Sequence, residues 1–273
     1  NDAQLKNSPQ IELMSTFKID SSLPLKKEGS KYLNYLTPKL SMLINPSDMK
    51  NHSETKRNIN NENIFDINRL GLTDSLEAGK SLTAGLEYKK EKLEDINKYF
   101  ELKLATVFRD KEETFIPKAS TLNKKTSNLF GSLSNNFSEK FNFKYDFALN
   151  NNLNTFDYNK ISSTISLNNL VTQFSFIEER GDIGSTNTFE NKSKYIFNEN
   201  NSISFKTRRN RKINLTEYYD LVYEYQNDCL TAGIKYNKTY YEDRDLKPTE
   251  NLLFTITLFP LTTYEQQVDY EGL

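Results

Sequence analysis

The chain has 273 residues and a formal net charge of -1, from 36 Lys+Arg and 37 Asp+Glu. This balance provides no global positive field of the kind that attracts phosphates, so we exclude a nucleic-acid partner. A hydrophobic content of 36% and a mean hydropathy of -0.73 are low for a water-soluble globule, yet aromatic residues make up 12% of the chain, which argues against disorder.

The absence of any run of 18 or more apolar residues excludes a transmembrane helix. A transmembrane β-barrel fits the same composition, because each strand presents only alternate residues to lipid and the others to a wet lumen. The N-terminus NDAQLKNSPQ has no basic region followed by an apolar one, so it does not resemble a signal peptide. We therefore expect the chain to be a downstream piece of a longer precursor.

Alternating apolar residues predict strands along the whole chain. In order, they are expected at 10–25, 36–44, 82–90, 99–108, 128–136, 141–149, 155–167, 171–178, 188–197, 202–209, 218–226, 230–237 and 252–259. Pro38 lacks a backbone N–H, so we expect it to be tolerated only near the start of its strand. The pattern predicts an all-β fold, an antiparallel transmembrane β-barrel of the outer-membrane type, as a partial barrel of about 13 to 14 strands.

The connections between the predicted strands alternate in length. Short Asn-rich connections suit tight turns, because Asn tolerates positive φ; they lie at 150–152, 168–169, 199–201 and 227–228. Longer polar connections at 110–127, 179–187 and 242–250 alternate with them, as in outer-membrane barrels. A further polar loop at 49–63 contains His52, which we expect to be solvated and without a ligand role.

The sequence contains no recognisable catalytic constellation, since it has one His, one Cys, no phosphate-binding glycine loop and no paired carboxylates at a motif spacing. We predict no enzyme activity, no cofactor and no metal site. Two charged clusters, RRNRK at 208–212 and EDRD at 242–245, are most simply solvated loops. The alternatives are binding of lipid phosphates or nucleic acid at the first and of a divalent cation at the second.

Three stretches together resemble the barrel domain of the LptD family, also called OstA or organic solvent tolerance protein, and most closely its alphaproteobacterial type. They are LTPKLSMLINPSD, NRLGLTDSLEAGKSLTAGLEY and YDLVYEYQNDCLTAGIKYNKTYYEDRDLKPTENLLFTITLFPL. The resemblance implies an outer-membrane translocon of a Gram-negative bacterium that inserts lipopolysaccharide into the outer leaflet. It also implies a plug lipoprotein of the LptE type and a periplasmic bridge protein of the LptA type as partners.

The resemblance further implies that residues 1–273 are the C-terminal part of the barrel domain, without the periplasmic jellyroll and the signal peptide. Family barrels have a lateral seam between the first and last strands, and barrel-assembly machinery recognises the last one. The matching residues are Leu252, Phe254, Ile256, Leu258 and Phe259.

Cys229 is the only cysteine, so no disulfide can form within the chain. By residue type alone it is a small buried or lipid-facing side chain. The resemblance implies instead a disulfide from Cys229 to a cysteine of the N-terminal domain, outside this chain.

Two other functions remain open from the sequence. One is a different outer-membrane barrel, either a porin-like channel or an autotransporter-type pore, which requires a closed, even set of strands within this chain. The other is a soluble β-repeat surface protein that binds a partner or glycan, in which the aromatic faces pack on each other as a sandwich core.

Overall fold

The computed structural model describes residues 14–240, 248–258 and 262–268. It forms one antiparallel sheet of fifteen strands, and its helical content within these residues is one short 3-10 helix, η1 (Lys118–Ser120). The strands are β1 (Phe17–Ser22), β2 (Leu25–Glu28), β3 (Tyr32–Asn45), β4 (Gly79–Lys92), β5 (Asp95–Arg109), β6 (Leu129–Ser138), β7 (Phe141–Leu149), β8 (Phe156–Leu167), β9 (Leu170–Glu179), β10 (Asn187–Asn198), β11 (Asn201–Asn210), β12 (Leu215–Gln226), β13 (Leu230–Thr239), β14 (Glu250–Leu258) and β15 (Thr262–Val268).

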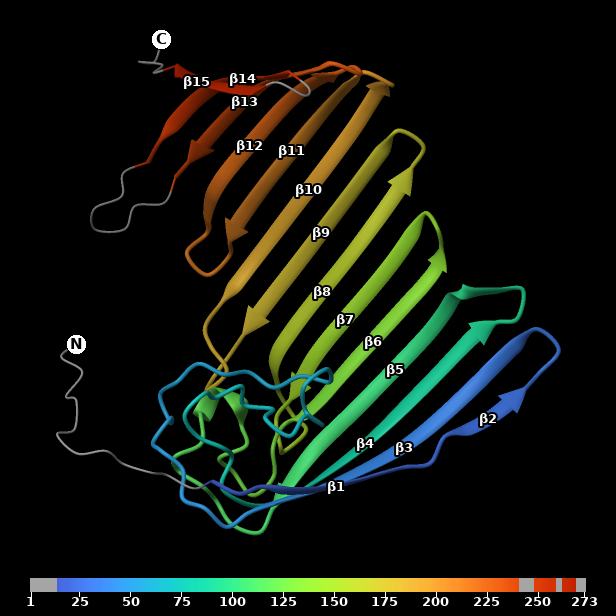
Figure 1. The fold of residues 1–273 in the computed structure, drawn as a ribbon, viewed down its shortest axis with the longest axis vertical. Helices are drawn as coiled ribbons and strands as arrows, with labels where there is room; N and C mark the ends of the chain where they lie inside the picture. Colours follow the sequence, from blue (N-terminus) through green and yellow to red (C-terminus); the bar gives the residue numbers. More distant parts are fainter. Residues whose placement is uncertain (1–13, 241–247, 259–261, 269–273) are drawn as a thin grey trace.

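Each strand from β3 onward pairs with its sequence neighbours, and β1 and β2 both pair with β3. The sheet curves and twists from β1 to β15 (Figure 1), and within the described residues no pairing joins these two strands. The all-β fold and the partial barrel are therefore confirmed. A porin-like pore made by this chain alone is not supported, because fifteen strands are an odd set and the described sheet is unclosed.

The predicted number of strands is too low because two strands lack the alternating pattern. β2 has the sequence LKKE, with a single apolar residue, and β15 has the sequence TTYEQQV, in which polar residues occupy both faces. Both form through backbone pairing with a neighbour, β2 with β3 and β15 with β14. Apolar periodicity identifies only strands that have one apolar face.

Pro38 lies in the interior of β3, not near its start as predicted. Its carbonyl accepts a hydrogen bond from the Leu23 N–H at 3.1 Å. Because the N–H and C=O of a residue in an antiparallel strand point to the same side, the position of the missing N–H faces the break between β1 and β2. No ladder hydrogen bond is required there. The interruption at Leu23 and Pro24 therefore accommodates a proline that a continuous central strand would exclude.

The two faces of the sheet differ in polarity. In β7, Phe143, Tyr145 and Phe147 alternate with Lys144 and Asp146, and the register places Tyr145 between the apolar Leu133 of β6 and Ile161 of β8. Large apolar side chains on the outer face stay accessible, and within the described residues no second sheet covers them. Such a surface is suited to lipid. The described part of the chain therefore does not form the sandwich core expected for a soluble β-repeat protein.

Connection lengths separate the two ends of the strands (Figure 1). Short turns at one end span residues 29–31, 93–94, 139–140, 168–169, 199–200 and 227–229. Longer connections at the other end span 46–78, 110–128, 150–155, 180–186, 211–214 and 240–249, the last only partly described. The predicted asymmetry is confirmed, except that 150–152 belongs to the long-loop end.

Candidate functional site

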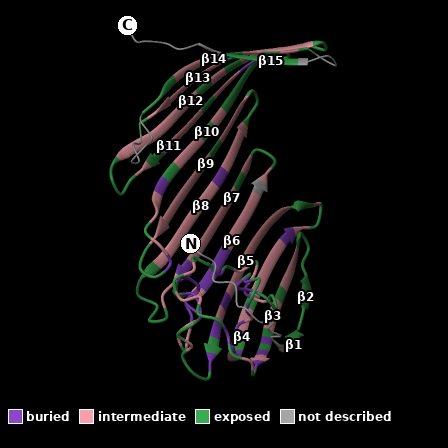
Figure 2. Cartoon of the chain, turned by 60° about the vertical axis from the view of Figure 1, so that its left-hand side comes forward, coloured by how far each residue is buried: buried purple, intermediate pink, exposed green. Residues whose placement is uncertain are grey.

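Two long connections, 46–78 and 110–128, fold onto the inner face of the sheet near the long-loop end; together they are called the loop lobe here. Three of its apolar residues, Ile64, Ile116 and Leu122, are at most 1% exposed and pack in one cluster with wall residues Val107 and Phe130. Figure 2 shows buried residues gathered where the loop lobe meets the sheet. The interior of this protein is therefore a loop-on-sheet core at one end of the barrel wall.

A buried ion cluster holds the loop lobe to the wall. Glu77, at the end of the first loop, receives hydrogen bonds at 2.6 Å from both Nε and Nη2 of Arg69, and a further one from Nη1 of Arg109 on β5. All three side chains are at most 3% exposed. The remaining donors of Arg69 bind Thr83 Oγ1 and Ser81 Oγ on β4, both at 2.8 Å, and the carbonyl of Ile64 at 3.2 Å. Each member of the cluster thus forms hydrogen bonds, as buried charges require, while Nε of Arg109 has no partner among the described residues.

Burial by itself raises the pKa of Glu77. The positive charges and hydrogen bonds of Arg69 and Arg109 outweigh that effect, so the pKa of this carboxyl lies below its usual value. Glu77 therefore remains ionised at neutral pH. Its contribution to docking is fully present above the ordinary carboxyl pKa and is lost only as the pH falls through the lower folded-state value.

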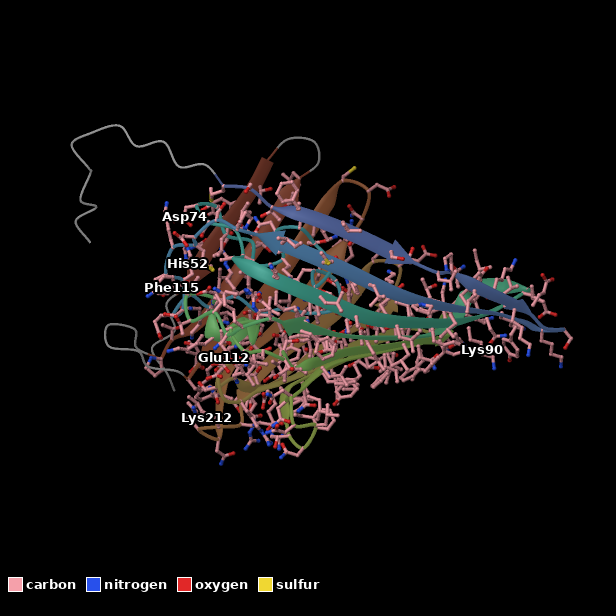
Figure 3. All side chains as sticks on the ribbon, turned by 90° about the horizontal axis from the view of Figure 1, so that it is seen from below. His52, Asp74, Lys90, Glu112, Phe115 and Lys212 are labelled. Carbon is pink, nitrogen blue, oxygen red and sulfur yellow. The ribbon has the colours of Figure 1, made fainter. Side chains whose placement is uncertain are left out.

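His52 is not the solvated side chain that the sequence predicts. Its side chain is 17% exposed, and Nε2 lies 3.1 Å from Asp74 Oδ1. Its backbone N–H donates to the carbonyl of Phe115 at 2.9 Å, which joins the two loops of the lobe, as Figure 3 illustrates. The prediction fails because the polar loop folds back on itself. In the part of the chain that is described, no group of three or more His, Cys, Asp or Glu side chains is arranged to hold a metal ion.

A cavity of about 430 Å³ lies between the loop lobe and the wall. Lys103, Lys144 and Lys160 line it, together with carboxylates that include Glu62 and Asp146. Lys144 Nζ lies 2.9 Å from Glu62 Oε1 and 3.5 Å from Asp146 Oδ2. Because the lysine charges are matched by these acids, the cavity suits a polar ligand better than a purely anionic one.

A second hollow, of about 370 Å³, lies on the inner face of β9–β13 and is more basic. Its lysines outnumber its one acidic lining residue, Asp220; they are Lys192, Lys194, Lys206 and Lys235. Lys192 and Lys206 are directly opposite across β10 and β11. Lys192 pairs with Glu190 at 3.0 Å and Lys194 lies 3.8 Å from Glu224, so these acids offset part of the positive charge. We call these four lysines and Asp220 the basic groove; it is suited to a phosphorylated or otherwise anionic saccharide.

Cys229 is exposed in the short turn between β12 and β13. Its backbone N–H donates to the side-chain oxygen of Asn227 at 3.0 Å, which shapes the turn. The residue is therefore at the opposite end of the barrel wall from the loop lobe, and its thiol is accessible to a partner outside this chain.

The predicted terminal strand corresponds to β14, which contains Leu252, Phe254, Ile256 and Leu258 on its outer face. β14 pairs with β13 on one side and with β15 on the other, so β15 is the edge strand of the described sheet. The seam predicted at β14 thus lies one strand inside that edge, and its recognition by assembly machinery stays a prediction. Phe259 and the acidic cluster 242–245 lie outside the described residues.

Sequence reasoning missed the ion cluster and the basic groove. Arg69 and Glu77 lie in a connection without periodicity, so nothing in the sequence pairs them with Arg109. The groove lysines did carry a signal, because they occupy the polar positions of three alternating strands. Aligning those positions across strands requires the register, which the sequence alone does not give.

None of the described segments is a helix long and apolar enough to cross a membrane. A single antiparallel sheet with an apolar outer face, a polar inner face and connections that differ in length between its ends defines an outer-membrane β-barrel protein. The model of the family LptD, LPS transport system D, matches residues 2–210. The chain belongs to this family, which associates it with lipopolysaccharide transport at the outer membrane of Gram-negative bacteria.

Solved structures similar to the chain include a double mutant of the porin from Rh. blastica, with a TM-score of 0.37 and 7% identity over 93% of this chain and 94% of that chain. Another, from a study titled "Asymmetric conductivity of engineered proteins", has a TM-score of 0.37 and 10% identity over 97% of this chain and 93% of that chain. A comparison with curated protein sequences finds no significant match.

Proposed function

We propose that this chain forms part of the barrel wall of a translocon that inserts lipopolysaccharide into the outer leaflet. The observation that carries the proposal is the basic groove on the inner face, opposite an outer face that is apolar. The saccharide with its phosphates passes along the polar side, while the acyl chains leave sideways into the membrane. No covalent chemistry is required.

The rest of the assembly follows from the same proposal. Residues 1–273 are the C-terminal part of the barrel domain, and further strands complete the barrel at the unpaired edges of β1 and β15, because an open edge in lipid leaves backbone groups without hydrogen bonds. A plug lipoprotein of the LptE type, a bridge protein of the LptA type and barrel-assembly machinery are the proposed partners. They are proposed from the family, not from a surface of this chain.

The basic groove is tested by reversing two of its charges. The double variant Lys192→Glu/Lys206→Glu is expected to lower surface lipopolysaccharide several-fold at equal protein level in the outer membrane, because it repels the phosphates that the lysines attract. The matched control is Lys26→Glu/Lys27→Glu, which reverses two exposed charges on β2. Unchanged surface lipopolysaccharide in the groove variant, with altered uptake of small solutes, would support a diffusion pore instead.

Cys229 tests the orientation of the barrel and the proposed disulfide. In intact cells a membrane-impermeant maleimide is expected to leave Cys229 unlabelled, because short turns of outer-membrane barrels face the periplasm. Permeabilised cells should remain unlabelled until a reductant opens the disulfide. Labelling in permeabilised cells without reductant would contradict the proposed disulfide but not the orientation. Labelling in intact cells would contradict the orientation of the barrel.

A further inference from the structure

The outer face is apolar along most of its length but carries two arginines at the long-loop end of β9–β12. A hollow of about 440 Å³ lies there. Its lining residues, called the rim site here, are Phe176, Phe189, Arg209, Arg211 and Asn214. Figure 3 shows neighbouring Lys212 at the same end as His52 and Asp74 of the loop lobe, away from Lys90.

The strand register builds the rim site. Phe189 on β10 is directly opposite Phe176 on β9 and Arg209 on β11, so two rings and a guanidinium form one row across three strands. The Arg211 N–H donates to the carbonyl of Asn187 at 2.8 Å, and its guanidinium lies 5.3 Å from the centre of the Phe176 ring. The arginines are therefore held beside the aromatic rings by the backbone and by cation–π contact.

The arginines at this end of β11 differ in whether an acidic side chain pairs with them. Arg208, which faces the lumen, pairs with Glu217 at 2.9 Å. Arg209 and Arg211 form no ion pair within the described residues, and Arg209 donates instead to the neutral Asn214 side chain at 2.5 Å. Two exposed guanidiniums retain free donors that match the geometry of a phosphate. The adjoining rings provide an apolar floor of the kind that meets the first part of a lipid tail.

We propose that the rim site binds the phosphate of an anionic glycolipid from the leaflet at the long-loop end. Arg209 and Arg211 hold the phosphate, while Phe176 and Phe189 contact the apolar part of the lipid next to the head group. The inference rests on the proposed function in one respect, since the long-loop end must face the cell exterior, where lipopolysaccharide is that glycolipid. It places a lipid acceptor on the outside of the wall, separate from the basic groove.

The test is binding of lipopolysaccharide in mixed micelles to the protein extracted from the outer membrane. Arg209→Gln/Arg211→Gln is expected to weaken binding tenfold or more, and removal of the phosphates from the lipopolysaccharide should weaken binding to the unaltered protein to the same degree. Competition by millimolar inorganic phosphate distinguishes a site for the phosphate of a lipid from a site for free phosphate. Full displacement by phosphate would indicate a free-phosphate site and overturn the lipid proposal.

Lys56→Gln/Arg57→Gln is the matched control, because it removes the same charge from exposed residues of the loop lobe at the same end. An equal loss of affinity in this control would mean that any loss of positive charge at this end weakens binding, and it would overturn the rim site. The Cys229 labelling result separates the two proposals. Normal orientation with undiminished binding by the arginine variant rejects the rim site and leaves the proposed function intact.

Discussion

Replacement of Glu77 by alanine is expected to release the loop lobe from the barrel wall while the strand pairs remain in place. The substitution leaves two guanidiniums buried without a counter-charge, and removal of one partner from a buried ion pair costs about 3–5 kcal/mol. Hydrogen exchange of the protein extracted from the membrane measures the effect. Amides of 60–72 and 115–122 should lose protection by that free energy, while those of β10–β13 keep theirs.

Glu54→Gln is the control for the Glu77 variant. Glu54 forms an ion pair with Lys118 at 2.7 Å that also joins the two loops, but both side chains are largely solvated, 82% and 52% exposed. An exposed pair contributes less than about 1 kcal/mol, so protection should barely change. Similar exchange in both variants would mean that apolar contacts hold the lobe and that the buried cluster is not required.

Replacement of Gly131 by valine is expected to destabilise the centre of the sheet. Gly131 on β6 is directly opposite Phe147 on β7, and a β-carbon at this glycine would overlap the phenylalanine ring. The ring has little room to move, because Tyr145 and Phe156 have ring centres 5.3 Å and 5.7 Å away from it. Overpacking of this kind costs about 1–3 kcal/mol. The expected result is a lower temperature of unfolding, measured by heating samples before mild-detergent gels.

A second substitution tests whether the overlap is the cause. In Gly131→Val/Phe147→Ala the space above β6 is free, so the double variant should be more stable than the sum of the two single effects predicts. Leu133→Val on the same strand changes an outward side chain without adding a β-carbon and should have a small effect. Strict additivity in the double variant would show that the glycine is required for its backbone and not for the ring.

The fold could be predicted largely because a lipid-facing strand imposes a period of two. The strands around Phe143 and Tyr223 were identified because aromatic or other apolar residues recur at every second position, interrupted in the second strand only by Val222. β15 was missed because its polar sequence provides no such period, and Pro38 was misplaced because its tolerance depends on a break in the neighbouring strand. A sequence pattern reports on one strand at a time, whereas the formation of β15 and the tolerance of Pro38 each depend on a neighbouring strand.

The interior could not be predicted, for a different reason. Residues 46–78 are irregular, and their apolar side chains, such as Ile59 and Ile64, follow no strand or helix period that would indicate which of them are buried. The contact that docks them is tertiary. The ring of Phe65 lies against Gly85 of β4, where a β-carbon would come within 2.6 Å of it, and only the folded chain brings the two together. His52 was judged solvated on the same local evidence.

The loop lobe alters how this barrel can vary over evolutionary time. Long surface loops of a barrel commonly accept insertions more readily than short ones. Here the relation is inverted: 151–155 is exposed at every residue, whereas 46–78 and 110–128 carry the side chains of the interior. An epitope tag or a lineage-specific insertion is therefore accommodated in the small connection after β7, while the two largest loops are constrained like a hydrophobic core and should diverge as slowly as one.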